Sequence, residues 1–256
     1  METAFIQADR AGLPANRNCF AALEGFAERG IATRLFFPGA TDSQEYLTGT
    51  LTAIGVGRST LVHGTIPIVH TALRMLGANP PAPLDYPEPL QPFLGRRIWE
   101  TTLGEVRDES SWPMFMKPRG AGKAFGGILV RSFRNLLSTL TLDDGFPVWA
   151  SEPMPFASEW RVFVLKGEIV DVRPYSPDPF RTTPDRGRLE EMVAAYEGAP
   201  AAYALDVGVA ERDGGTYLVE ANDGYALGTY GLDPRLYANM IQTRWEQLLF
   251  TPVLEH

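Results

Sequence analysis

The apolar positions in the first third of the chain alternate between short continuous runs and longer stretches with helical spacing. The short runs, which we predict to be strands, are residues 4–8, 31–37 and 60–63. The helical spacing predicts an amphipathic helix over residues 14–29, which ends at Gly30, and an apolar helix from Gly64 to Leu76. Strands and helices that alternate in this way predict a small α/β unit with a mostly parallel sheet.

From about Phe93 onward the pattern changes to pairs of strand-like segments joined by turn residues. The three predicted hairpins are residues 112–119 with 127–131, 159–165 with 168–174, and 203–210 with 216–221. A further strand is predicted over residues 146–151, and helices over residues 136–140, 189–196 and 234–250. Hairpins interspersed with helices predict an α+β arrangement with largely antiparallel sheets.

A proline-rich stretch separates these two patterns. Residues 78–92 contain six prolines in fifteen residues, and proline fits neither a helix interior nor a central strand. A surface strap and a flexible linker are equally compatible with this composition. We predict an α/β domain over residues 1–77, a proline-rich connector over residues 78–95, and a second domain over residues 96–253. Residues 254–256 are interpreted as a tag remnant.

Composition narrows the classes of protein that the chain can represent. The net charge is -8 and the pI is about 5.0, which argues against a sequence-independent nucleic-acid binder, because such a protein needs a strongly basic face. No stretch approaches the ~20 apolar residues of a membrane span, and the N-terminus lacks the pattern of a signal peptide. The single cysteine, Cys19, excludes an internal disulfide and fits a cytoplasmic location. Its apolar surroundings predict a packing role rather than a nucleophile.

An acidic pair late in the chain is the first candidate site. Asp206 lies in one apolar strand, and Glu220 and Asn222 lie in the next. A buried, unpaired carboxylate is costly, so such groups normally have a partner or hold a metal. Two carboxylates and an amide oxygen form a hard oxygen donor set that suits magnesium, which takes part of its coordination shell from water and substrate phosphates.

A glycine-rich turn after Lys117 is the candidate phosphate site. Lys117 ends an apolar strand, and four glycines, including Gly122, lie in the following residues 120–127 together with Lys123. Glycines allow backbone amides to approach phosphate oxygens closely. The segment matches neither the Walker A pattern nor Gly-x-Gly-x-x-Gly. The alternative is an exposed hairpin turn with solvated lysines.

The middle of the chain offers groups for the rest of a nucleotide. Two prolines keep residues 152–156 extended and leave backbone groups unpaired, so this segment can present amide and carbonyl groups to an adenine edge, and Glu159 can hold ribose hydroxyls. Arg161 and Arg173 lie on paired strands of one predicted hairpin, and arginine binds phosphate or carboxylate with a planar fork. The alternative for both arginines is a surface ion pair with Glu159 or Asp171.

These pieces occur in an order that resembles the ATP-grasp superfamily of ADP-forming ligases. Within it, the chain is most similar to the small clade named for two arginines and a lysine. The resemblance covers residues 95–250 and is carried by Ser151-Glu152 and by residues 159–163 and 219–228. It implies an α+β ATP-grasp fold whose two lobes grip ATP, about residues 96–150 and 151–253. It also implies that a small α/β, Rossmann-like pre-ATP-grasp domain precedes this fold.

The resemblance also implies roles for individual residues. Lys117 and the loop with Gly122 and Lys123 would contact ATP phosphates, Glu152, Met154 and Phe156 the adenine, and Glu159 the ribose. One or two magnesium ions would lie on Asp206, Glu220 and Asn222, and Arg161 and Arg173 would meet the γ-phosphate or acyl phosphate. Two positions depart from the usual pattern. The early lysine is replaced by Arg96 or Arg97, and the arginine two residues before the metal aspartate by Ala204.

The implied reaction is ATP-dependent joining of a small-molecule or peptide carboxylate to an amine. No side-chain nucleophile is required, which agrees with the scarcity of histidine and cysteine. His63, at a strand end, and His70 are interpreted as structural, with substrate contact as the alternative for His63. Asp223, Tyr225 and Tyr230 are candidates for an acceptor pocket or for ordinary turn structure. The competing hypotheses are an ATP-dependent phosphotransferase and a nucleotide-binding module without catalysis. Oligomeric state does not follow from the sequence.

Overall fold

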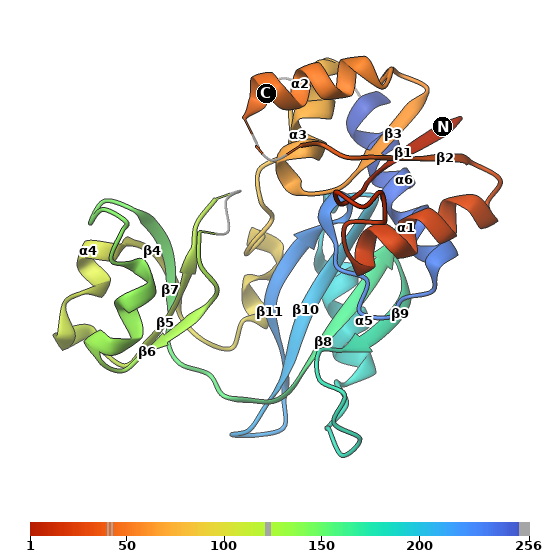
Figure 1. The fold of residues 1–256 in the computed structure, drawn as a ribbon. Coiled ribbons are helices and arrows are strands. Elements are labelled where there is room, and N and C mark those ends of the chain that lie inside the picture. Colours follow the sequence, from red (N-terminus) through yellow and green to blue (C-terminus); the bar gives the residue numbers. More distant parts are fainter. Residues whose placement is uncertain (40, 42, 121–123, 251–256) are drawn as a thin grey trace.

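The computed structural model describes residues 1–39, 41, 43–120 and 124–250. Within these residues the strands form three sheets, one parallel and two antiparallel, with helices packed around them (Figure 1). The predicted boundaries of the last domain, at 253, and of the tag remnant, at 254–256, lie outside the described residues.

The N-terminal sheet is parallel, as predicted. Its strands are β1 (Thr3–Gln7), β2 (Ala32–Phe36) and β3 (Thr60–His63), in the order β2-β1-β3. Its helices are α1 (Arg17–Glu28), α2 (Gln44–Ala53) and α3 (Ile66–Met75). The side chain of Asn16 caps α1 by accepting from two backbone N–H groups. The sequence pattern does not predict α2, because its ten residues, with three threonines and a glycine, have only a weak apolar stripe.

The second sheet has the order β4-β7-β5-β6 and lies apart from the others (left in Figure 1). Its strands are β4 (Ile98–Thr102), β5 (Met114–Pro118), β6 (Ile128–Val130) and β7 (Pro147–Ser151), with α4 (Leu103–Val106) and the 3-10 helices η2 (Glu109–Ser111) and η3 (Phe133–Thr139). The predicted hairpin is the antiparallel pair β5–β6. Helix η3 replaces the predicted helix over 136–140. The sequence pattern does not predict β4, because this strand is half-buried and carries polar residues.

The third sheet has the order β11-β10-β8-β9 and is antiparallel throughout. Its strands are β8 (Phe156–Leu165), β9 (Glu168–Pro174), β10 (Ala202–Ala210) and β11 (Thr216–Asp223), with α5 (Arg186–Ala195), η4 (Gly224–Ala226) and α6 (Pro234–Phe250). Both predicted hairpins are present. In the β8–β9 turn, Lys166 and Gly167 both have positive φ (52° and 81°), the conformation that a two-residue type I′ hairpin turn requires.

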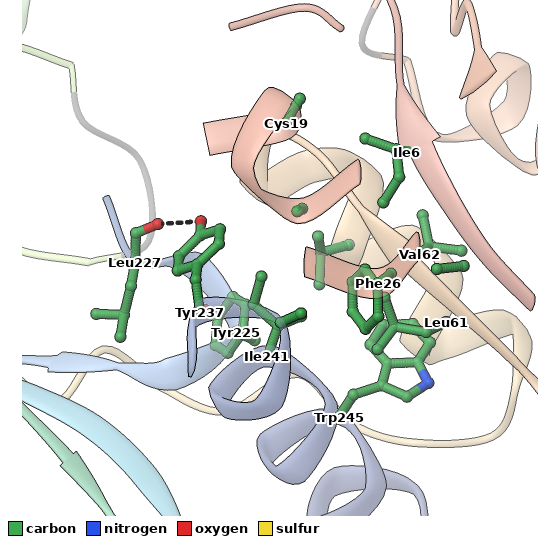
Figure 2. Packing of buried hydrophobic residues seen from close by; sticks show 14 of the residues in the cluster. Ile6, Cys19, Phe26, Leu61, Val62, Tyr225, Leu227, Tyr237, Ile241 and Trp245 are labelled. Carbon is green, nitrogen blue, oxygen red and sulfur yellow. Dashed lines mark hydrogen bonds between the residues drawn. The ribbon is translucent and has the colours of Figure 1, made fainter. Parts of the chain in front are cut away.

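Successive side chains along the strands of the third sheet pack into two different hydrophobic cores, one on each face of the sheet. Phe163, Ala202 and Ala204 face a core shared with the N-terminal sheet and α6. Figure 2 shows part of this core, including Phe26 of α1 and Trp245 of α6. The alternate positions, among them Val162, Tyr203 and Leu205, face a second core with α5. Because successive side chains point to opposite faces of a strand, the register of this sheet also determines which polar residues share a face.

The proline-rich connector is a strap across the molecule rather than a loose linker. Asp85 forms an isolated antiparallel bridge to Ala221 of β11, in which the Ala221 N–H donates to the Asp85 carbonyl at 2.8 Å. The connector then forms the 3-10 helix η1 (Glu88–Phe93), which buries Leu90 and Phe93 in the second core. The strap therefore brings residue 85 beside the strand that carries Glu220 and Asn222.

The contact between α1 and α6 gives a direct test of this packing. A Cβ on Gly25 would collide with the backbone carbonyl of Pro234. We expect Gly25→Ala to destabilise the protein by about 1–3 kcal/mol, although alanine favours helix. The control is Gly49→Ala in α2, where a Cβ meets nothing within 4 Å and about 0.5–1 kcal/mol of stabilisation is expected. Urea unfolding of both variants measures the difference, and equal effects would contradict the packing.

Candidate functional site

The register of the third sheet places the predicted polar residues on one face. Asp206 of β10 is paired with Arg161 of β8 on one side and with Glu220 of β11 on the other. Asn222 lies opposite Ala204, two residues from Asp206, and Arg173 of β9 lies opposite Arg161. Residues that are directly opposite or two apart share a face. Four strands therefore deliver these groups to the side of the sheet that faces the N-terminal domain.

Asp206 is the centre of a buried hydrogen-bond network. Its carboxylate accepts a bidentate pair from Arg161, with Nε on Oδ1 and Nη2 on Oδ2, both at 2.7 Å. Oδ2 also accepts from the Tyr175 hydroxyl at 2.5 Å and from Asn222 Nδ2 at 2.9 Å. Burial alone lowers the pKa of Arg161, but the hydrogen bonds and charge of Asp206 raise it, so the guanidinium stays charged. Asp206 is thus held as one half of a buried ion pair.

Lys117 joins the two antiparallel sheets across the cleft between them. Its Nζ donates to Glu220 Oε2 at 2.7 Å and to Asp85 Oδ1 at 2.8 Å, and it lies 4.5 Å from the centre of the Tyr86 ring. Burial lowers the pKa of Lys117, but Tyr86, Glu220 and Asp85 outweigh burial and raise it. The ammonium is therefore charged and held between carboxylates at the end of β5.

A cleft of about 350 Å³ contains most of these groups. The predicted site residues that line it are Lys117, Glu159, Asp206, Glu220 and Asn222. Gly120, Gly126 and Gly127 of the glycine-rich turn also line it, whereas the predicted residues Gly122 and Lys123 lie outside the described residues. The pKa of the Glu159 carboxylate is raised by burial and by the nearby charges of Asp206 and Glu220. The residues predicted to face phosphate and the predicted acidic residues therefore line one cavity.

The two predicted arginines do not line this cleft. Arg161 is engaged beneath it with Asp206, and its guanidinium lies 4.7 Å from the centre of the Tyr230 ring. Arg173 donates to Asp171 two residues away on its own strand, at 2.7 Å, which is the alternative that the sequence left open. The contact of both arginines with phosphate stays a prediction.

The predicted adenine segment is also absent from the cleft lining. Glu152 pairs with Arg97, whose N–H donates to the Glu152 carboxylate at 3.0 Å. The Phe156 ring packs beside the guanidinium of Arg96. Met154 is half-buried. Arg96 donates to the backbone carbonyls of Leu94 and Leu218, so it ties the strap to β11. The adenine-binding role of Glu152, Met154 and Phe156 stays a prediction.

Two candidates for the acceptor pocket have structural partners. Asp223 accepts a buried bidentate pair from Arg244 of α6 at 2.8 and 2.7 Å. The Tyr225 hydroxyl lies 2.8 Å from His70 Nε2. Both Asp223 and Tyr225 also line the cleft. Each residue therefore has a structural partner and also lies at the surface of the cleft.

Cys19 has the packing role that its sequence context predicts. It is buried in the core of the N-terminal domain. Burial raises the pKa of its thiol to about 11, which argues against a thiolate nucleophile.

Asp85 is the site residue that the sequence did not reveal. Its carboxylate accepts from Lys117 and, through Oδ2, from the indole N–H of Trp149 at 3.1 Å, while its carbonyl accepts from Ala221. It also has a positive φ of 43°, which is unusual for a residue other than glycine. An acid inside a proline-rich stretch was the available signal, but its meaning depends on a contact with a strand 136 residues further on.

Removing the charge of Asp85 is expected to strengthen nucleotide binding. The carboxylate competes with phosphate for Lys117, so Asp85→Asn should tighten MgADP binding by roughly 1 kcal/mol, or about fivefold. The matched control is Glu88→Gln, an exposed acid on the same connector. Calorimetric titration of both variants with MgADP measures the effect. Weaker binding by Asp85→Asn would mean that this carboxylate positions Lys117 for phosphate instead of competing with it.

The donor set on β10 and β11 fits a hard divalent cation. Asn222 Nδ2 donates to both Asp206 Oδ2 and Glu220 Oε1 (2.9 and 3.3 Å), so the two carboxylates converge on one amide. Rotating that amide by half a turn presents its oxygen beside theirs. Among the described residues, no group of three His, Cys, Asp or Glu side chains is arranged to hold a metal. A cation here would therefore use Asn222 and ligands from the substrate.

The arrangement of sheets is similar to that of solved ATP-grasp enzymes. The matches include an ADP complex of N5-carboxyaminoimidazole ribonucleotide synthetase, with a TM-score of 0.59, 12% identity, and coverage of 95% of this chain and 76% of that one. D-alanine–D-alanine ligase from Bacillus anthracis, complexed with ATP, has a TM-score of 0.59, 14% identity, and coverage of 96% and 97%. L-amino acid ligase from Bacillus licheniformis has a TM-score of 0.58, 14% identity, and coverage of 98% and 75%. At these identities the likeness establishes the fold, an α+β ATP-grasp fold.

The particular family follows from a match to a family model. The matching model describes the ATP-grasp domain of family 2 of the clade named for two arginines and a lysine, and it covers residues 93–240, more than half of the chain. The chain therefore belongs to this family of ATP-grasp proteins, as the order of its motifs indicates. No curated sequence matches it. No helix in the described part of the chain has both the length and the apolar character that a bilayer crossing requires.

Proposed function

We propose that the protein is an ATP-dependent carboxylate–amine ligase. The observation that carries this proposal is the cleft itself. Lys117, from the second sheet, faces the acidic set Asp206, Glu220 and Asn222, from the third sheet, within one cavity. A lysine opposite clustered oxygen donors suits a magnesium-bound polyphosphate. Membership of an ATP-grasp family supports this chemistry. In this proposal the first domain is a Rossmann-like pre-ATP-grasp domain.

The chain's residues divide the work between the two sheets. Lys117 holds a phosphate oxygen, and the glycines that line the cleft admit backbone N–H groups to the phosphates. Glu159 receives the ribose hydroxyls, and residues 152–156 border the adenine. Asp206, Glu220 and Asn222 hold magnesium, which neutralises phosphate charge when bound. Arg161 fixes the Asp206 carboxylate. Arg173, on the neighbouring strand β9, is assigned to the γ-phosphate or acyl phosphate in this proposal.

The proposed reaction has two steps. A substrate carboxylate oxygen attacks the γ-phosphorus of ATP, the bond from that phosphorus to the bridging oxygen breaks, and ADP leaves with the electron pair. An amine then attacks the acyl carbon, which releases inorganic phosphate and one proton and forms an amide. Positioning and charge neutralisation supply the catalysis. No protein nucleophile is needed, which fits a Cys19 thiol that is protonated and buried.

Trapping the acyl phosphate tests this proposal. Purified protein is incubated with MgATP and pools of amino acids or dipeptides, with hydroxylamine added as the amine. We expect release of ADP and phosphate together with an acyl hydroxamate, which forms only from an activated carboxylate. A stable phosphorylated product without hydroxamate would instead identify the alternative, a phosphotransferase acting on a hydroxyl. Absence of ADP formation with every pool would count against catalysis.

A further inference from the structure

A second cavity adjoins the nucleotide cleft and has no part in the functions assigned above. Its volume is about 180 Å³, and its lining comes from the first turn of α1, the segment from β3 into α3, and the residues after η4. The lining residues are Asn16, Asn18, Cys19, residues 63–66, Ala226 and Leu227. Ile66 and Ala226 line both this cavity and the cleft. The two spaces therefore meet just beyond the end of the strand that carries Glu220 and Asn222.

The topology of the N-terminal sheet favours a ligand at this place. His63 is the last residue of β3, and Asn16 caps α1 after β1. The chain moves from β1 to β2 on one side and then returns past β1 to β3 on the other. Helix α1 lies on one side of the sheet with α6, whereas α2 and α3 lie together on the other (Figure 1). Ligands in open α/β sheets bind at such a switch point, outside the carboxyl ends of the strands.

His63 supplies an unused polar group at this point. Its side chain lines the cavity, is only 3% exposed, and has an Nδ1 without a hydrogen-bond partner among the described residues. Its ring packs edge-on against Tyr237 at 5.8 Å, which fixes its plane. Burial lowers the pKa of His63 to about 4 and outweighs a backbone hydrogen bond with Asn18, which raises it, so the ring is neutral at neutral pH. Buried polar atoms normally have a partner, so this nitrogen points to a missing one.

The adjacent start of α3 supplies a further donor. Thr65 is the N-cap of this ten-residue helix, but its side chain makes no capping hydrogen bond. The Thr65 N–H donates to Gln7, and Pro67 has no N–H. Ile66, which lines the cavity, lies in the first turn of the helix, so its N–H has no intrahelical partner. This N–H shares the partial positive charge of the helix N-terminus.

We propose that this second cavity binds the carboxylate-bearing substrate of the ligase, with the carboxylate at the α3 N-terminus and His63. This inference rests on the proposed function and names the site of its acid. No Asp, Glu, Lys or Arg lines the cavity among the described residues, so the N–H donors favour an acid group and leave an ammonium without a counter-charge. The cavity would hold about six waters at ~30 Å³ each, which suits an acid the size of a small amino acid. Its junction at Ile66 opens toward the phosphates.

Nuclear magnetic resonance of the imidazole nitrogens tests the site with sodium acetate as the probe. The three histidines give separate signals in 15N-labelled protein, and His63→Gln assigns the signal of His63. We expect a saturable shift of the His63 signal with acetate and none with sodium chloride or methylammonium chloride. His70, whose Nε2 contacts Tyr225, is the internal control. A non-saturable shift, or equal shifts of both histidines, would overturn the proposal.

A second variant avoids dependence on His63 itself. Thr65→Asp places a carboxylate at the N-cap of α3, where it caps the helix and occupies the donors that the substrate would use. We expect it to fold and to weaken acetate binding at least tenfold, without changing MgADP affinity. Ser43→Asp, at the N-cap of α2, is the matched control and should bind acetate normally. Unchanged acetate binding in Thr65→Asp would contradict the site. Failure of MgADP to bind wild type would contradict the proposed function instead.

Discussion

Arg161→Met is expected to destabilise the protein by about 3–5 kcal/mol, because it leaves the buried Asp206 carboxylate without its counter-charge. Arg161 and Asp206 are 6% and 3% exposed and are joined by two hydrogen bonds of 2.7 Å. Tyr175 and Asn222 remain as neutral donors, but they do not balance the charge. Chemical denaturation gives the free energy of unfolding directly.

The matched control is the neighbouring arginine on the same sheet face. Arg173 is 40% exposed and pairs with Asp171 on its own strand, so Arg173→Met should cost less than about 1 kcal/mol. Adding Asp206→Asn to Arg161→Met should restore much of the lost stability. Similar costs for the two arginines would contradict the buried ion pair.

The pH dependence of the Arg161→Met variant has a defined sign. Burial raises the pKa of Asp206, and loss of Arg161 removes an opposing effect. The native state of the variant then binds a proton more readily than the unfolded chain does. Its stability deficit relative to wild type should therefore be largest near neutral pH and shrink as the pH falls toward the ordinary aspartate pKa, about 4.

Glu220→Gln is expected to lower magnesium-dependent ADP formation at least about 100-fold, because it removes the charge of a metal ligand while keeping its shape. Glu220 reaches both Lys117 and Asn222, so the amide also weakens the hold on the lysine. Glu211→Gln, on the exposed β10–β11 turn, is the control and should retain activity. Thermal unfolding of both variants verifies that the fold is intact. Full activity in Glu220→Gln would contradict the metal assignment.

The strands that carry the acidic set were predictable, because strong turn residues mark the hairpins, but the face that the set shares was only partly so. Glu220 and Asn222 are two residues apart on one strand, so they must share a face. Counted from the turn, simple alternation would place Asp206 opposite Val219, but a register shift between Asp206 and Val207 places it opposite Glu220. A similar shift between Phe163 and Val164 brings Arg161 opposite Arg173. Their partners were less predictable. That Arg161 contacts Asp206, whereas Arg173 contacts Asp171, depends on which strand is interior and which is at the edge.

Contacts between segments far apart in the chain could not be predicted. Local sequence patterns do not predict the bridge of Asp85 to Ala221. The proline content of the connector is equally compatible with a strap and with a flexible linker. Helix α2 was not predicted because its apolar stripe is weak, and β4 was not predicted because both of its faces are half-buried. The cavity at His63 needed the arrangement of α1, α3 and the segment after η4, although the position of His63 at a strand end hinted at a crevice.

If the cleft between Lys117 and the acidic set is the nucleotide site, it binds ATP together with magnesium. Isothermal titration of wild type and of Glu220→Gln with ATP, with and without magnesium, measures this binding. We expect wild type to bind ATP more tightly with magnesium, and the variant to lose that magnesium-dependent gain. Absence of ATP binding by wild type, or an identical magnesium effect in the variant, would contradict this assignment.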